Sequence, residues 1–375
     1  MLGGIGKMRP CGHHHYYKYA HAVTCYGENT STSNNLAQID REYCKDVDEN
    51  NYWNFSLNNA TRIEGNCFQK GRFVGFVAPT PNLKYANNMF NSDNGMDSPH
   101  LTEIQIDYDN IERCNCLFYD FRLTSLPENF NPKTRNFYHL LTQGTATSIT
   151  NAHDGIFPYY PVLNEVVNGI NMFIRNNLRL DDNYTFENVT TASGMFGFGT
   201  RHITLLECPK NLSFKNVTNL NYFVFLGSPP APVTFTWFQT KDTMEKLTTA
   251  NNAFYNQTYL SDLYPDYESF SLPALSTASN MFYGCILNAT SIKKLSNALP
   301  VWESGSHPIT IGCHIDHKYD PEVNVALKKL SSDYITPIEE LGFTLPEEIT
   351  SFKGWTLTVQ WNGTATENAY PQPTE

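Results

Sequence analysis

Residues 277–285 read TASNMFYGC, and a closely similar phrase occurs four more times in the chain. The other copies are YANNMF at 85–90, NGINMF at 168–173, TASGMF at 191–196 and TANNAF at 249–254. Self-similarity of this kind, returning every 20 to 50 residues or so, is the sequence signature of repeat architectures. The phrase therefore indicates the fold more strongly than any other feature of the sequence.

Four of the five phrases place apolar side chains at offsets i, i+3, i+6 and i+7. In the first-quoted copy they are Leu275, Ala278, Met281 and Phe282. The equivalent positions in three other copies are Leu83, Ala86, Met89 and Phe90; Val189, Ala192, Met195 and Phe196; and Leu247, Ala250, Ala253 and Phe254. This spacing predicts a two-turn helix with one buried face. The Asn, Ser, Thr and Gly residues between them are poor helix formers, so packing would have to hold each helix.

A second signal, a brief apolar run ending near a turn, follows most of the phrases. The runs are LTEIQI at 101–106, RLTSLP at 122–127, HITLLECP at 202–209 and YLSDLYP at 259–265. They predict short strands with one buried face. One strand and one short helix cannot bury their own apolar stripe, so copies must stack with parallel strands. The predicted fold class is an α/β repeat solenoid. The competing interpretation is an ordinary α+β domain with chance similarity.

The pattern Leu-x-x-Ala-x-x-Met-Phe-x-x-Cys followed by a leucine-rich strand resembles the irregular leucine-rich repeats of the BspA-like group. The resemblance covers residues 52–299 and implies a short parallel strand plus a short helix in each repeat. Such repeats occur in surface proteins of gut bacteria and protists and in virion proteins of phages that infect Bacteroidetes. The chain departs from the group in long inserts at 91–100 and 227–240.

The two ends of the chain do not follow the repeat. We expect residues 1–50 to be a docking or capping segment, 51–299 the repeats, and 300–375 a C-terminal cap and tail. In and just before the cap, helices are predicted at 288–299 and 320–332, from their capping residues and apolar spacing. Strands are predicted at 307–316 and 354–364, from alternation of apolar and polar residues.

Composition excludes some classes of function. The formal net charge is −11 and the sequence pI about 5.5, which argues against a nucleic-acid partner. The sequence has no run of 18 apolar residues, so no membrane-spanning helix is expected. Residues 1–21 lack the apolar stretch of an export signal. Nine scattered cysteines are expected to be mostly free thiols.

Four residues near the N-terminus raise the question of a metal. Cys11, His13, His15 and Cys25 are zinc-type ligands within a short segment, but their spacing matches no standard zinc motif. The favoured interpretation is an aromatic segment that packs on the first repeat or on a partner. A weaker metal question concerns HIDHKYD at 314–320. No cofactor is expected.

Signs of catalysis are missing from the sequence. It contains no Gly-x-Ser-x-Gly elbow and no phosphate-binding loop, and Cys285 falls at a position that the repeat would bury. A glycosidase-type pair of carboxylates, brought together by the fold from distant positions, is an alternative that the sequence leaves open. We therefore expect a protein that is not an enzyme, with a glycan depolymerase as the least favoured class.

The resemblance implies a non-enzymatic phage virion protein, in a tail fibre, head fibre or tail-associated part, which displays its repeats for binding a host receptor or glycan. Residues 1–50 would contact other virion proteins, and a homo-oligomer would be compatible with a fibre. Localisation would be the virion, assembled in the host cytoplasm. The alternative is a cell-surface adhesin of a gut bacterium or protist. Alternation along the predicted strands places these contact candidates outward: Thr102, Glu103, Gln105, Thr124, His202, Thr204, Ser261 and Asp262.

Overall fold

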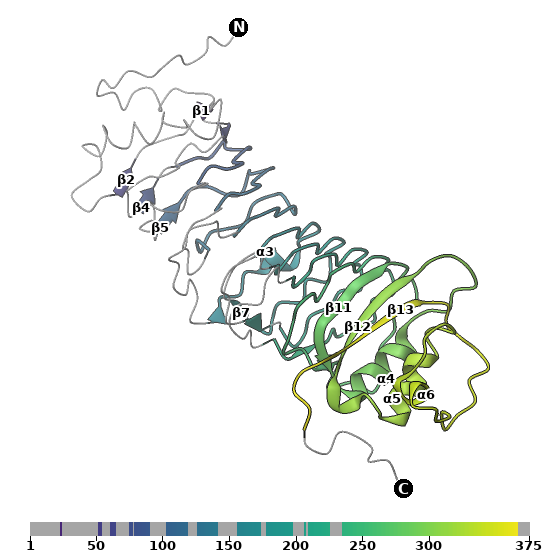
Figure 1. Cartoon of the computed structure of the whole chain (residues 1–375). Helices are drawn as coiled ribbons and strands as arrows, with labels where there is room; N and C mark the ends of the chain where they lie inside the picture. Colours follow the sequence, from purple (N-terminus) through teal and green to yellow (C-terminus); the bar gives the residue numbers. More distant parts are fainter. Residues whose placement is uncertain are drawn as a thin grey trace. The chain divides into compact units, whose positions relative to one another are not determined.

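The computed structural model describes residues 23–24, 52–54, 61–64, 75–77, 79–90, 103–118, 126–141, 156–173, 178–197, 206–207, 209–225 and 235–366. It is a mixed α/β protein in which short parallel strands form small sheets (Figure 1). The chain divides into two compact units, Met1–Asn176 and Asn177–Glu375. The expected class of short parallel strands in an α/β protein is confirmed at this level.

The described residues of the first unit form two parallel sheets. Strand β1 (Val23–Thr24) pairs with β3 (Ile63–Glu64). Strand β4 (Gly75–Val77) lies between β2 (Tyr52–Asn54) and β5 (Glu103–Gln105). The unit also holds β6 (Ile156–Phe157) and the one-turn helix α3 (Pro161–Asn164), which begins with proline at its first position. Strand β5 confirms the prediction for 101–106.

Short parallel pairs continue in the second unit. Strand β7 (Leu178–Leu180) pairs with β8 (Leu206–Glu207), and β9 (Trp237–Phe238) pairs with β10 (Asp262–Leu263). Strands β8 and β10 confirm the predictions for 202–209 and 259–265. The fourth predicted strand, 122–127, lies mostly outside the described residues.

The last part of the second unit is a regular βαβαβ arrangement. Strand β11 (Ala278–Leu287) is followed by α4 (Ala289–Ala298), β12 (Pro308–His314), the 3-10 turn η1 (Ile315–His317), α5 (Pro321–Lys328), the short α6 (Pro337–Glu340) and β13 (Thr356–Asn362). The three strands form a parallel sheet in the order β11-β12-β13, and the helices lie together beside it (Figure 1). Asn288 and Asp320 cap α4 and α5. All four elements predicted here are confirmed.

The prediction that each phrase forms a short helix is wrong for the described copies. Four copies are hydrogen-bonded turns, and the copy at 277–285 belongs to β11. The backbone of one phrase instead pairs with that of the next phrase along the chain, and we call each phrase together with the strand that follows it a layer. The N–H groups of Ala250, Asn252 and Phe254 donate to the carbonyls of Thr277, Ser279 and Met281 at 2.8, 2.8 and 2.9 Å. Such alternate donors are the pattern of a parallel ladder.

The same alternation recurs within each of the two units. In the first unit, Ala86, Asn88 and Phe90 donate to Arg113, Asn115 and Leu117. In the second unit, Ala192, Gly194 and Phe196 donate to Asn219, Asn221 and Phe223, and Leu220, Tyr222 and Val224 donate to Thr249, Asn251 and Ala253. Residues 114–118 (CNCLF) and 220–223 (LNYF), which match the phrase only loosely, therefore pair as the five quoted copies do.

A left-handed residue in the middle of each phrase explains why asparagine recurs there. Asn88, Asn171, Asn252 and Asn280 have φ of 56, 53, 54 and 54°, and Gly194 takes the same place with φ 60°. A closing bond runs from Met89 N–H to the Ala86 carbonyl at 3.2 Å. A turn with φ above zero at its third residue favours Gly or Asn. In four of the five copies the phrase therefore forms a turn within a stretch of backbone that pairs with its neighbour as a parallel strand.

The burial predicted for the apolar positions is confirmed. Each of the four positions in the copies at 83–90, 189–196, 247–254 and 275–282 is at most 2% exposed. Aromatic rings from neighbouring layers stack on one another, as Phe254 does on Phe282 with centroids 5.3 Å apart. The offsets thus identified the core correctly even though the local backbone is not helical.

We expect Asn252→Ala to lower the free energy of unfolding by about 1–2 kcal/mol. Alanine is strained in the left-handed conformation and lacks the short polar side chain that lets asparagine adopt it. Asn252→Gly should change the free energy of unfolding little, since glycine adopts that conformation without steric cost. Urea unfolding followed by circular dichroism measures both. Equal losses for the two variants would show that the asparagine side chain, and not the backbone conformation, is what the position needs.

Candidate binding surface

Half of the predicted contact residues lie outside the described residues: Thr102, Thr124, His202 and Thr204. Glu103 and Gln105 lie in β5 of the first unit, and Gln105 is exposed. Ser261 directly precedes β10 and Asp262 begins it, and both are partly exposed. Ser261 and Asp262 are therefore the one pair of candidates in the second unit that the described residues bring together.

The Ser261–Asp262 pair has a structural task. Ser261 Oγ donates to Asp262 Oδ2 at 2.7 Å, and the side-chain amide of Asn288 donates to the other carboxylate oxygen. Asn288 in turn accepts the Ser291 N–H at 2.8 Å and so caps α4. Asp262 thus orients the cap of the helix that follows β11. Its carboxylate is engaged inside the protein.

A row of hydroxyl side chains was missed by the sequence interpretation. Three of its members donate to the backbone carbonyl of the member before: Thr218 to Thr190 at 3.1 Å, Thr248 to Thr218 at 3.0 Å, and Ser276 to Thr248 at 3.1 Å. We call these four residues the hydroxyl row. A signal was available in the sequence, because each member directly follows the first apolar residue of its repeat, as Thr248 follows Leu247. The row was missed because the phrases were predicted to be helices, which do not pair with neighbouring segments through their backbones.

Next to the hydroxyl row runs an asparagine row, Asn221, Asn251 and Ser279. The carboxamide oxygen of Asn221 accepts the Asn251 N–H at 2.7 Å, and that of Asn251 accepts the Ser279 N–H at 2.9 Å. All three residues are partly exposed. Neighbouring parallel strands lie about 4.8 Å apart. The two rows therefore offer uncharged hydrogen-bonding groups at that interval.

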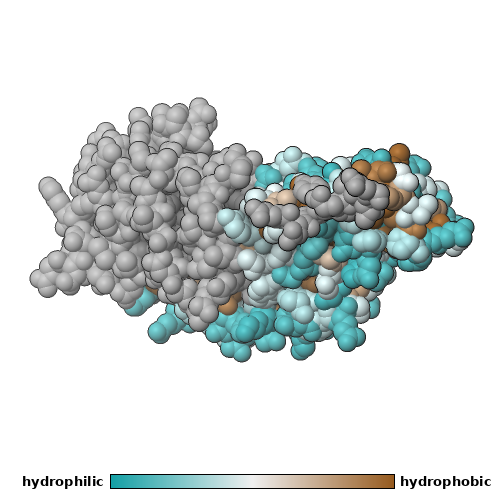
Figure 2. Space-filling model, turned by 60° about the horizontal axis from the view of Figure 1, so that its bottom comes forward, coloured by the Kyte–Doolittle hydropathy of each residue, from teal (hydrophilic) through white to brown (hydrophobic). Residues whose placement is uncertain are grey.

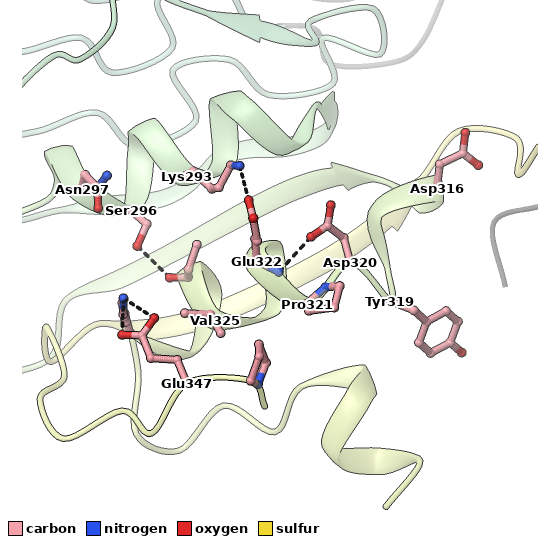
Figure 3. Close-up of a pocket in the computed structure, with 13 residues that line it drawn as sticks. Lys293, Ser296, Asn297, Asp316, Tyr319, Asp320, Pro321, Glu322, Val325 and Glu347 are labelled. Carbon is pink, nitrogen blue, oxygen red and sulfur yellow. Dashed lines mark hydrogen bonds and ion pairs between the residues drawn. The ribbon is translucent and has the colours of Figure 1, made fainter. Parts of the chain in front are cut away.

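A depression of about 1150 Å³ opens beside α4 and α5 (Figure 3). Its charged side chains bind one another: Lys293 contacts Glu322 at 2.6 Å, and Lys329 contacts Glu347 at 2.9 Å. Asp320 accepts two N–H groups at the start of α5. The charges that line this depression are thus committed to internal contacts, and it is a weaker candidate than the two rows.

Three cysteines are enclosed in the core: Cys114, Cys285 and Cys313. Burial raises the pKa of each thiol well above its usual value, so the thiols are protonated at neutral pH. The Cys285 thiol also donates to the carbonyl of Phe254 at 3.2 Å. The burial expected for Cys285 from its place in the repeat is confirmed.

We expect these three thiols to resist iodoacetamide in the native protein, because the reactive thiolate is both disfavoured and inaccessible. Alkylation at pH 8, followed by peptide mass spectrometry, should find them unmodified before and modified after unfolding in urea. Rapid native labelling of Cys285 would contradict the buried arrangement of β11.

No group of three His, Cys, Asp or Glu side chains in the described part of the chain is arranged to hold a metal ion. Cys11, His13, His15 and Cys25 lie outside that part. None of the helices within the described ranges is long and apolar enough to cross a membrane. In the segment 314–320, His314 and Asp316 approach to 3.5 Å.

Comparisons of the chain with models of protein families, with curated proteins and with solved structures found no match. The hydroxyl row and the asparagine row offer polar, uncharged groups. Hydroxyls that donate to a neighbouring carbonyl keep lone pairs that can accept hydrogen bonds. Such a surface suits ligands that carry repeated hydroxyl or amide groups.

Proposed function

We propose that the phrases build a solenoid of irregular leucine-rich repeats, of the kind found in the BspA-like group. The observation that carries this proposal is the backbone ladder in which alternate N–H groups of one phrase donate to the next layer, as from Ala250 to Thr277 at 2.8 Å. Buried apolar offsets and stacked rings support it. The individual repeat would hold a turn with a left-handed residue where the resemblance implies a helix.

We propose further that the protein is a non-enzymatic virion component of a phage, in a tail fibre, head fibre or tail-associated part. The resemblance supports this assignment, as does an N-terminal segment outside the repeat that can serve for docking to other virion proteins. The proposed task of the repeats is binding of a host surface protein or glycan. A depolymerase is not favoured by the depression beside α4 and α5, where Lys293 pairs with Glu322 and Lys329 with Glu347.

The hydroxyl row and the asparagine row are the proposed contact surface. Their members offer polar groups without formal charge, as a ligand with many hydroxyl groups requires. Asparagine and tyrosine are abundant in the chain, with 40 and 22 copies, and such side chains supply hydrogen bonding and stacking at low entropic cost. Tyr222 and Tyr259, at 47% and 44% exposed, are available for stacking.

Two measurements test the assignment. Mass spectrometry of purified virions should detect the chain, and its absence there would exclude the virion role. A glycan array with the isolated protein should show binding that Thr218→Val together with Thr248→Val weakens, because valine keeps the shape and removes the hydroxyl. Thr243→Val is the matched control, since the Thr243 hydroxyl contacts Glu245 and lies outside the row. Undiminished binding by the double variant would exclude the hydroxyl row.

The alternative function is that of a cell-surface adhesin of a gut bacterium or protist. It uses the same repeat surface, so glycan binding does not separate the two. Fractionation does: the adhesin would be recovered from the cell envelope, and the virion protein from particles.

A further inference from the structure

In the three-stranded sheet β11-β12-β13 of the second unit, β13 (Thr356–Asn362) is an outer strand with one unpaired edge (Figure 1). Its continuous register with β12 extends over seven residue pairs, from Pro308–Thr356 to His314–Asn362. The bond from Thr356 N–H to the His307 carbonyl, at 3.0 Å, sets which residues face β12. Because parallel ladders use alternate residues, the backbone groups of Leu357, Val359 and Trp361 point away from β12.

Those outward groups make no hydrogen bond to any other described segment. An unpaired row of this kind is a template for pairing with another strand, and proteins usually protect it with lysine, proline, a bulge or a cover. Strand β13 has none of the first three: its sequence TLTVQWN contains no charge and no proline, and its register with β12 is unbroken. Nothing in the strand repels a partner.

The apolar face of β13 is also less covered than that of its neighbour. Ile309, Ile311 and Cys313 of β12 are at most 1% exposed. Their register partners in β13 are Leu357, Val359 and Trp361, and each of these is partly exposed. The layer of apolar side chains that continues through β12 is therefore open to solvent at β13. On the face seen in Figure 2, the described surface is mostly hydrophilic, with apolar residues gathered on one part of it.

The sequence of β13 is complementary to itself. Polar and apolar residues alternate symmetrically about Val359, so an antiparallel copy centred there sets Leu357 against Trp361 and Thr358 against Gln360. Apolar residues then meet apolar residues on one face, and polar residues meet polar residues on the other. The outward backbone groups belong to the same symmetric set, and the pairing would form about six hydrogen bonds between the two strands. A contact between two identical surfaces must be self-complementary in this way.

We propose that β13 is a homodimer interface, in which the strands of two copies pair antiparallel about Val359 and join their sheets into one. The partner is a second copy of this chain. The proposal goes beyond the proposed function and does not depend on it, because it concerns the sheet edge and not the ligand that the repeats bind.

Sedimentation equilibrium of the full chain tests the oligomeric state. The expected species has twice the chain mass of 42.6 kDa and dissociates on dilution. Val359→Pro should abolish it, because proline removes an outward N–H and is tolerated at an edge whose N–H faces solvent. Near-ultraviolet circular dichroism checks that the variant stays folded. A wild-type chain that is monomeric up to its solubility limit, or a trimer, would overturn the proposal.

Cysteine cross-linking tests the register and stays informative if the proline variant fails to fold. In the proposed pair, the two copies of residue 359 have Cα atoms about 5.5 Å apart, within disulfide range. Val359→Cys should therefore cross-link under mild oxidation. Thr358→Cys is the matched control, because its two copies are diagonal neighbours about 7–8 Å apart. Equal cross-linking of the two variants, or none for Val359→Cys, would refute pairing centred on Val359.

Discussion

Phe254→Ala should destabilise the protein by about 4 kcal/mol, the typical cost of emptying a phenylalanine site in a close-packed core. Phe254 is 1% exposed and touches rings on three sides. Its centroid lies 4.9 Å from that of Phe238, 5.3 Å from that of Phe282 and 6.1 Å from that of Phe223. These rings come from the layers before and after it, so the cavity would loosen contacts between layers.

Urea unfolding measures the loss, and Tyr259→Ala is the control. Tyr259 is an aromatic residue in the next loop, but it is 44% exposed, so its truncation should cost less than about 0.5 kcal/mol. Equal effects of the two variants would mean that the closing phenylalanine of the phrase is not a core residue.

Gly312→Ala should cost about 3 kcal/mol, at the upper end of what overpacking costs in a core. A Cβ at this position would lie 2.5 Å from the carbonyl oxygen of Cys285 and 2.6 Å from that of Phe282. These are backbone atoms of β11, where the register with β12 shifts, and they cannot rotate away as a side chain would. The close approach also lets β13 reach β11: Asn362 Nδ2 donates to the Cys285 carbonyl at 2.8 Å.

Gly342→Ala is the matched control for the glycine at 312. Gly342 has φ 81° and no heavy atom within 4 Å of an added Cβ, so its substitution should cost only the left-handed backbone strain, about 1 kcal/mol. Thermal unfolding of both variants gives the comparison. A smaller loss for Gly312→Ala than for Gly342→Ala would mean that β11 and β12 are farther apart than described.

The core and the C-terminal elements could be predicted from the sequence because side-chain spacing and capping residues report on them directly. Asp320 followed by Pro321 marks the start of α5, and Asn288 marks that of α4. The phrase itself was misread, because offsets of three, six and seven residues fit a helix as well as a turn followed by a ladder. What separates the two is the left-handed residue, as at Asn88 with φ 56°.

The surface was less accessible to prediction than the core. Alternation along a strand identifies outward residues, but it cannot show that Asp262 is held by Asn288 and Ser261. The hydroxyl row depends on pairing between residues about thirty positions apart, such as Thr218 and Thr248. The hydroxyl residues recur at a fixed place in each repeat, but which of them pair follows from the ladder register, which no local pattern contains.

The central claim is that successive phrases pair with each other as parallel strands. Nuclear Overhauser effects in a deuterated sample, with protons restored at the α-carbons of the phrase residues, test it most directly. Hydrogen bonds from Ala250 and Phe254 to the carbonyls of Thr277 and Met281 place their amide protons beside the α-protons of Ala278 and Phe282. We predict cross-peaks for both pairs. Regular contacts from each α-proton to the amide three residues later within 247–254, with no cross-peak between 250 and 278, would show a helix and contradict the account.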